Sequence, residues 1–350
     1  NNTNWNDEIN QSAFMQNYSI GVRGGDDIAL YSFSLGYAHN NGNIQKTNFN
    51  RLNVRFNSDI KFTQHLTTQA NIAFAQITRD LFDDGINEHS SPLYLSYIKS
   101  PLYHPYQYGI SGKLFDKISD KDELGMGNPL AITDIAEGKT KNYRFTASLM
   151  PKYRFTDRFA LSALVGYSWD KIKESSFTPD FGLAEQQLYN AQGDWYGEGK
   201  NSVASLMTRH NTLTVGANAD WDLLKGMHNL KINGGFTYLN NTFESNYGMG
   251  YNTGSDNLKN LSVTNSALRT TTGTDDNWRT ARWHFVADYN LHYRYFLTAS
   301  TTLESNSRFG KNADGAIRIG GISWGMFPSV TAAWVVSNEQ WMKNLPFVNY

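Results

Sequence analysis

The sequence predicts an all-β fold, an antiparallel up-and-down transmembrane β-barrel, and two observations support it. Long segments alternate strictly between apolar and polar residues, the pattern of a strand with one face on lipid and the other on water. The connections between these segments are alternately short and long. In an up-and-down sheet this order places the short turns at one end and the long loops at the other, which is typical of outer-membrane barrels and unlike soluble sandwiches.

The composition agrees with β structure and excludes several classes of protein. The 350 residues include 20 Tyr, 20 Phe, 9 Trp and 29 Gly, residue types that favour strands and turns. The net charge of -1 gives no bulk attraction to nucleic acid, and the absence of cysteine excludes a disulfide scaffold. No apolar run approaches the ~20 residues of a membrane helix, which excludes a helical membrane protein but not a barrel.

The segment at residues 51–62 is the clearest predicted strand. Apolar side chains such as Leu52 and Val54 fall on one face, and polar or charged side chains such as Arg51 and Asn53 fall on the other. A turn at 63–65 leads into a second alternating segment at 66–78, which makes a hairpin. We expect the charged face to line an aqueous lumen, because a charge facing lipid at mid-membrane costs about 2–4 kcal/mol.

The same hairpin unit recurs along the chain and brings the number of predicted strands to eleven. Many segments could reach the ~10 residues of a tilted membrane strand, whereas soluble strands average ~5–6. Aromatic residues lie near the strand ends, as in the girdles of a membrane barrel: Tyr143 and Phe155 bracket one strand, and Phe159 and Trp169 bracket the next. The other predicted strands are 16–23, 28–38, 142–155, 158–170, 211–221, 228–240, 282–295, 296–305 and 327–336.

The order of connections assigns one end of each strand to the short turns and the other end to the long loops. The short turns are 24–27, 63–65, 156–157, 222–227 and the region of Arg294; the long loops are 39–48, 79–141, 171–201, 241–276 and 305–326. A further strand is expected to begin at 347–350. Because an unclosed sheet leaves unpaired backbone groups in lipid, we expect these strands to belong to a larger barrel.

The last predicted strand and its flanks can be assigned in the same way. Val330, Ala332 and Trp334 should face lipid. Residues 308–326 should form an extracellular loop in which glycines supply tight bends, and 337–346 a periplasmic connection with a helical turn at 338–343.

The sequence predicts no enzyme, no catalytic or metal-binding residues and no cofactor. The eight histidines form no HExxH arrangement. Asp80, Asp83 and Asp84 lack the spacing of a calcium loop, and a solvated acidic loop is the better interpretation. The GYSWD segment at 166–170 is not a GxSxG nucleophile elbow and lies within a predicted strand.

Loop aromatics are the candidates for binding a substrate or a partner. The 79–141 loop carries five tyrosines, and a second, weaker candidate lies at 195–196. Tyrosines on a loop present flat faces with hydroxyl tips, which suit sugar rings or peptides. They could instead pack the loop onto itself or onto a partner protein, and both interpretations stay open. The candidates are Tyr94, Tyr97, Tyr103, Tyr106, Tyr108, Trp195 and Tyr196.

Several motifs resemble those of one family. They are Asn306-Ser307-Arg308-Phe309-Gly310, then Trp324-Gly325-Met326-Phe327-Pro328-Ser329, then Trp334 and Ser337-Asn338-Glu339-Gln340-Trp341-Met342. Residues 293–300, 15–57 and 128–132 fit the same pattern. In this combination, and over nearly the whole chain, the sequence resembles the barrel portion of SusC/RagA-type TonB-dependent outer-membrane transporters.

The resemblance carries expectations about fold, partners and location. It implies a nutrient importer of the bacterial cell outer membrane that takes up oligosaccharides or oligopeptides with a SusD-like surface lipoprotein. It implies a barrel of about twenty-two strands, in keeping with the plugged lumen of barrels that size. Residues 1–350 would form part of that one barrel domain, with 11–12 strands. The plug domain, through which the TonB complex acts, and the C-terminal strands would lie outside this chain.

Two other functions are compatible with the residues. One is a passive porin-like channel, with the same architecture but no energy coupling. The other is a secreted soluble β-rich protein that binds carbohydrate.

Overall fold

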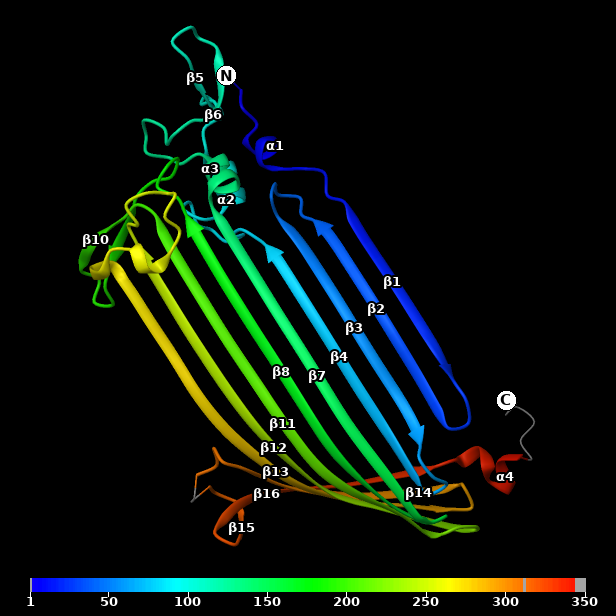
Figure 1. The fold of residues 1–350 in the computed structure, drawn as a ribbon. Helices are drawn as coiled ribbons and strands as arrows, with labels where there is room; N and C mark the ends of the chain where they lie inside the picture. Colours follow the sequence, from blue (N-terminus) through cyan, green and yellow to red (C-terminus); the bar gives the residue numbers. More distant parts are fainter. Residues whose placement is uncertain (1, 311–312, 344–350) are drawn as a thin grey trace.

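A single antiparallel sheet of twelve strands dominates the computed structural model, which describes residues 2–310 and 313–343. The strand order is β1-β2-β3-β4-β7-β8-β11-β12-β13-β14-β16-β15, so the wall is an up-and-down meander from which two small hairpins are set aside. Figure 1 shows the long strands inclined side by side in a curved wall. The predicted fold, a partial up-and-down barrel, is confirmed.

All eleven strands predicted from the sequence are present. They are β1 (Met15–Gly25), β2 (Ala29–Asn41), β3 (Asn48–Lys61), β4 (Leu66–Asp80), β7 (Glu137–Thr156), β8 (Phe159–Thr178), β11 (Ser202–Leu224), β12 (His228–Tyr251), β13 (Arg269–Leu291), β14 (Tyr295–Asn306) and β16 (Ile322–Trp334). The twelfth is the short β15 (Ile317–Ile319), which pairs with the start of β16. The strand start predicted at 347–350 lies outside the described residues.

The middle strands are much longer than the alternation in the sequence indicates. Strands β11, β12 and β13 contain 23, 24 and 23 residues. The predicted loops 171–201 and 241–276 are therefore too long, because residues 171–178 belong to β8, 241–251 to β12 and 269–276 to β13. The apolar alternation stops there: on the outward face Arg209 pairs with Glu244 at 3.3 Å. Backbone pairing continues without it, so the sequence pattern gives no signal for these extensions.

The register assigns every strand residue to one of two faces. Val54 pairs with Phe74, Phe74 with Phe145, and Phe145 with Trp169, so these side chains share the apolar outward face. The lumen face carries Asn53 and its cross-strand neighbours. Val330 and Trp334 lie on the outward face, 72% and 52% exposed, as the sequence predicts.

Aromatic rings mark the two borders of the outward apolar band. Near the short turns a row of rings crosses three strands: Phe155 lies 5.7 Å from Phe159, which lies 6.0 Å from Trp221. Tyr167 and Trp169 follow eight and ten residues after Phe159 on β8. At ~3.3 Å per residue this is roughly 26–33 Å along the strand, or roughly 20–25 Å after a tilt of ~40°. That height matches the ~25 Å apolar band of membrane barrels.

A carboxylate joins the ends of β14 and β16 at the short-turn end. The hydroxyl of Tyr295 and the indole N–H of Trp334 both donate to Oε1 of Glu339, at 2.6 and 3.1 Å. The hydrogen bond from Tyr295, followed by that from Trp334, lowers the pKa of Glu339. The chain then forms η3 (Val336–Asn338) and α4 (Gln340–Lys343), in agreement with the predicted helical turn.

Short helices and hairpins gather at the long-loop end of the wall (Figure 1). They are α1 (Trp5–Ile9), α2 (Pro92–Ile98), α3 (Pro129–Ile135), the β5–β6 hairpin (Tyr106–Tyr108 and Leu114–Ile118), the β9–β10 hairpin (Gln186–Tyr189 and Trp195–Gly199), η1 (Leu261–Val263) and η2 (Ser266–Leu268). Within residues 2–310 and 313–343, every helix is too short or too polar to span a bilayer.

The face assignment can be tested with adjacent positions on β3. Val54→Arg places a charge on the lipid-facing side, where it costs about 2–4 kcal/mol near mid-membrane, whereas Asn53→Arg places it in the lumen. We expect the first variant, and not the second, to lower the amount of heat-modifiable folded barrel in outer-membrane fractions on gels. Equal losses in the two variants would contradict the assigned faces.

Candidate functional site

The long-loop end carries a small folded unit, which we call the extracellular cap. It consists of α1, α2, α3, the connecting residues 99–128 and the segment 181–185. Its apolar cluster joins parts of the chain that are far apart in sequence: Trp5, Ile9, Leu95, Ile118, Leu130, Ala131, Ile132 and Leu183. Helices this short are not stable alone, so burial of this cluster is what holds them.

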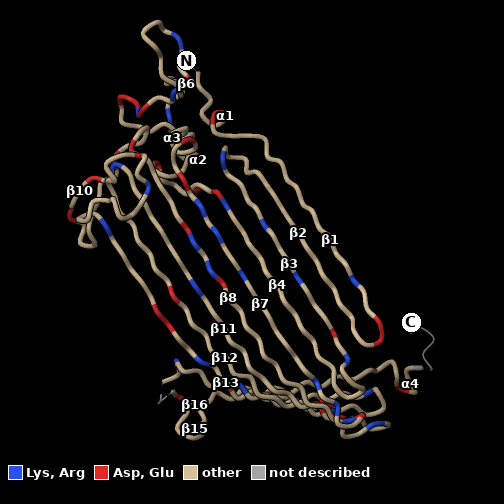
Figure 2. Tube along the Cα trace, viewed as in Figure 1, with Lys and Arg blue, Asp and Glu red and all other residues tan. Residues whose placement is uncertain are grey.

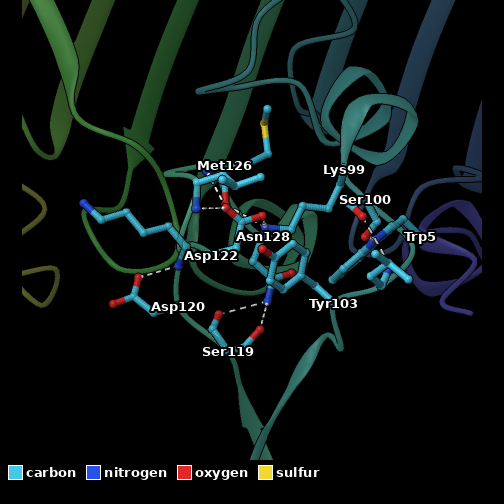
Figure 3. Close-up of polar contacts among 12 residues, drawn as sticks. Trp5, Lys99, Ser100, Tyr103, Ser119, Asp120, Asp122, Met126 and Asn128 are labelled. Carbon is cyan, nitrogen blue, oxygen red and sulfur yellow. Dashed lines mark hydrogen bonds and ion pairs between the residues drawn. The ribbon is translucent and has the colours of Figure 1, made fainter. Parts of the chain in front are cut away.

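Asn128 organises the centre of the cap (Figure 3). Its Oδ1 accepts the N–H of Leu130 and so caps the start of α3, where Pro129 follows. Its Nδ2 donates to the carbonyls of Pro105 and Ser119, both at 2.9 Å. Each of these groups would be costly to bury unpaired, so this one side chain fixes three segments of the cap relative to one another.

A buried ion pair joins α2 to the loop before α3. Lys99 Nζ lies 2.5 Å from Oδ2 of Asp122, and the two side chains are 2% and 3% exposed. Lys99 also donates to the carbonyl of Met126 at 2.6 Å, and its ammonium lies over the rings of Trp5 and Tyr103 at 5.9 and 5.1 Å. The second oxygen of Asp122 accepts the backbone N–H groups of Leu124 and Met126. Both charges are therefore fully paired, as burial demands.

The two partners respond differently to burial. Burial lowers the pKa of Lys99, against the opposing effect of Asp122. Burial alone would raise the pKa of Asp122, but its hydrogen bonds from Lys99 and from the backbone outweigh this and lower it. The direction for Asp122 agrees with the geometry, because three donors converge on its two oxygens.

The structure divides the seven predicted site aromatics into packed and exposed groups. Tyr103 and Tyr106 pack against the apolar cluster of the cap, and Tyr94 is half-buried. The exposed members are Tyr97, Tyr108, Trp195 and Tyr196, at 67%, 53%, 57% and 45%. Trp195 and Tyr196 lie on the separate β9–β10 hairpin, where the Trp195 indole donates to Gln187 at 2.7 Å. Binding by these residues stays a prediction.

The Ser-Arg-Phe-Gly motif attaches the loop after β14 to β13. The Arg308 guanidinium lies 4.1 Å from the centre of the Trp278 ring and forms an ion pair with Asp276. Asn306 accepts the N–H of Arg308 and donates to Thr280. The motif thus has an architectural role at the start of the 305–326 connection.

Sequence reasoning missed a possible site on the lumen face. A cavity of about 620 Å³ opens there over β1–β4 and β7, and its lining includes Arg51, Arg55 and Arg144. The alternation of residues 51–61 reveals the charged face, but only the register shows which strands place their side chains beside it. In the described ranges, no group of three or more His, Asp or Glu side chains is arranged to hold a metal ion.

Comparisons with known proteins can be set against this architecture. No protein-family model matches the chain. TonB-dependent receptor P3 of Formosa agariphila is 22% identical over 350 residues, which cover 98% of this chain and 32% of the relative. TonB-dependent receptor SusC of Bacteroides thetaiotaomicron is also 22% identical, over 98% of this chain and 33% of the relative. The chain therefore spans about a third of the length of the curated relatives it matches.

A solved structure supports the same fold. The structure of the RagAB peptide transporter superimposes on 99% of this chain and 36% of that chain, with a TM-score of 0.74 and 17% identity. A second structure, of the RagAB peptide importer in its open-open state, covers 93% of this chain with a TM-score of 0.69 and 18% identity.

The strand topology, the two faces and these comparisons define the chain as part of the wall of an outer-membrane β-barrel. Within that class it is similar, along nearly its whole length, to the barrel of SusC/RagA-type TonB-dependent transporters. The resemblance and the outer-membrane location predicted from the sequence are confirmed. The relatives are named as receptors and transporters, in agreement with the prediction that the chain is not an enzyme.

The buried ion pair gives a direct test of the cap. Lys99→Met leaves the Asp122 carboxylate buried without its cation, which costs about 3–5 kcal/mol. We expect faster protease cleavage within residues 81–136 on intact cells, followed by mass spectrometry. The matched control is Lys46→Met: Lys46 pairs with Asp134 at 2.8 Å but is 56% exposed, so its loss should cost no more than ~1 kcal/mol. Equal protection of the two variants would show that the buried pair does not hold the cap.

Acid should open the cap by a related route. The folded-state pKa of Asp122 is lowered, so its charged form stabilises the cap above the pKa of the unfolded carboxyl, ~3.9. That stability is lost as the pH falls through the lowered pKa. We expect wild-type cap protection to persist from pH 7 to about 4 and to fall at more acidic pH. An Asp122→Asn variant should lack this acid-dependent loss, which hydrogen exchange of residues 118–131 can measure.

Proposed function

We propose that this chain is the wall and extracellular cap of a TonB-dependent importer that takes up oligosaccharides or oligopeptides across the outer membrane. The observation that carries the proposal is the similarity of 98% of the chain to TonB-dependent receptors, SusC among them. The strand topology supports it, because the short turns lie at one end of the wall and the cap and long connections at the other. Such a cap sits where cargo would arrive.

We also propose that residues 1–350 form part of a single barrel domain. The free edge of β1 has no strand partner among the described residues, since β1 pairs with β2 alone. A strand edge in hydrocarbon leaves several kcal/mol of unsatisfied backbone groups, so further strands must pair with it. The plug, and with it the contact to the TonB complex, would belong to other parts of the same protein.

The cap and the exposed loop aromatics are the proposed surface for a SusD-like lipoprotein. The similarity of the chain to the TonB-dependent receptor SusC and to the RagAB peptide transporter supports such a pairing here. Tyr97, Tyr108, Trp195 and Tyr196 are exposed on the long-loop side, where such a partner or its cargo could stack on them.

Neither alternative function has an observation in its favour. A soluble carbohydrate-binding protein would have to tolerate the outward band of exposed Ile, Val, Phe and Trp side chains in water. A passive channel shares this architecture, and energy coupling separates it from an importer.

Uptake measurements test the proposed function. Cells with and without the gene that encodes this chain are given a fluorescent tryptic peptide mixture or fluorescent malto-oligosaccharides, with and without a protonophore. We expect uptake of at least one cargo to require both the gene and the proton-motive force. Gene-dependent uptake that persists with the protonophore would instead establish a passive channel.

A further inference from the structure

The lumen cavity described above has an unusually one-sided charge. Its lining includes the guanidinium groups of Arg51 and Arg55 from β3 and Arg144 from β7, and no Asp or Glu. The register places all three on the same face: Asn53, between the two β3 arginines, pairs with Ala75, which pairs with Arg144. Figure 2 shows Lys and Arg positions continuing along the middle of the strands as well as at their ends.

The positions between these arginines carry small side chains. Ala73 and Ala75 occupy β4, which separates β3 from β7, and Gly36 and Ala38 lie beside β3 on β2. Because neighbouring strands are ~4.8 Å apart, the backbones of β3 and β7 are only about 10 Å apart across this alanine floor. A ligand group of several atoms can therefore lie over the alanines of β4, with arginines on both sides of it.

Several other charges on the lumen face are paired within the wall. Arg282 bonds Glu304 at 2.7 Å, and Lys152 bonds Asp220 at 2.8 Å. Arg144 itself uses part of its donor set on Asp170 at 2.6 Å. Arg51 and Arg55 differ: both are exposed, and neither has an ion pair or a side-chain hydrogen bond within residues 2–310 and 313–343. Among these described residues, nothing occupies their donors.

We propose that this cavity is a binding site for carboxylate groups on the cargo, so that the transporter prefers acidic oligomers to neutral ones. The inference rests on the proposed import function and narrows its substrate class. A guanidinium presents a planar fork of donors that matches a carboxylate with two parallel hydrogen bonds, and it stays charged at every physiological pH. The side chains of Asn53 and Ser34, which also line the cavity, can donate to the remaining lone pairs.

The shared chemistry admits two sources of carboxylate, an acidic peptide or an acidic sugar. Both can be tested on the complete transporter that contains this chain, purified in detergent. The anionic probes are tetra-aspartate and tri-galacturonate; the neutral probes are tetraserine and maltotriose. Isothermal titration should show tighter binding of at least one anionic probe than of its neutral counterpart, with an affinity that falls as salt is added. The anionic probe that binds more tightly identifies the class of cargo.

Substitution of the arginines tests the site itself. Arg51→Gln combined with Arg55→Gln should weaken binding of the anionic probe by about tenfold for each arginine and leave neutral probes unchanged. The control is Arg23→Gln combined with Lys61→Gln, which removes two cations from the same face but outside the cavity lining. It should change affinity less than threefold. Arg51→Lys with Arg55→Lys keeps the charge without the fork and should give an intermediate affinity.

Two results would overturn the proposal. One is equal wild-type affinity for anionic and neutral probes. The other is an equal loss in the two double-glutamine variants, which would show only a diffuse lumen charge. Heat-modifiable migration on gels confirms that each variant is folded. Titration needs neither TonB nor an energy source, so it tests this inference separately from import. A transporter that binds the anionic probe but does not import cargo contradicts the proposed function alone. A transporter that imports cargo without preferring anions contradicts this inference alone.

Discussion

The structure depends on the pairing of backbone hydrogen bonds between neighbouring strands. In hydrocarbon no water can replace a missing partner, so each N–H and C=O of a spanning segment needs a bond within the protein. The ladder between β11 and β12 meets this demand from Ser202 to Asp222 without a break in register. Once these hydrogen bonds satisfy the backbone, the side chains on each face are limited only by what that face contacts, lipid outside or water in the lumen.

The two faces make different use of that freedom. The outward face is mostly apolar and aromatic between the rings near Phe159 and those near Trp169. The lumen face is wet, so it carries charges that the wall partly neutralises, as in the Arg282–Glu304 pair. An arginine such as Arg51 can remain unpaired there at little cost to the fold.

Much of the wall could be predicted from the sequence, because its signal is local. Alternation identified eleven strands, their faces and the end at which the short turns lie. The alternation gave no signal where the strands extend beyond the membrane, because near Arg209 and Glu244 the outward face is polar as well. The cap was missed for a different reason: its helices have five to seven residues, and what stabilises them is contact between Trp5, Leu95 and Leu183. The motif residues Arg308 and Glu339 were recognisable as a pattern, but their contacts to Trp278 and Tyr295 depend on strand register.

Wall and cap are therefore held by different forces, and α1 connects them. Gln45, in the loop between β2 and β3, donates to the carbonyls of Glu8 and Ile9. Residues before β1 bind the loop between β4 and β7: Thr3 donates to the carbonyls of Pro101 and Tyr103, and the Trp5 indole donates to Ser100. Ion pairs such as Lys46–Asp134 are exposed and add little. The buried contacts of α1 thus fix the cap over the loop ends of β1–β7 (Figure 1). Arg51 and Arg55 lie on the lumen face of β3, one of these strands, so the proposed carboxylate site lies on the same part of the wall as the cap.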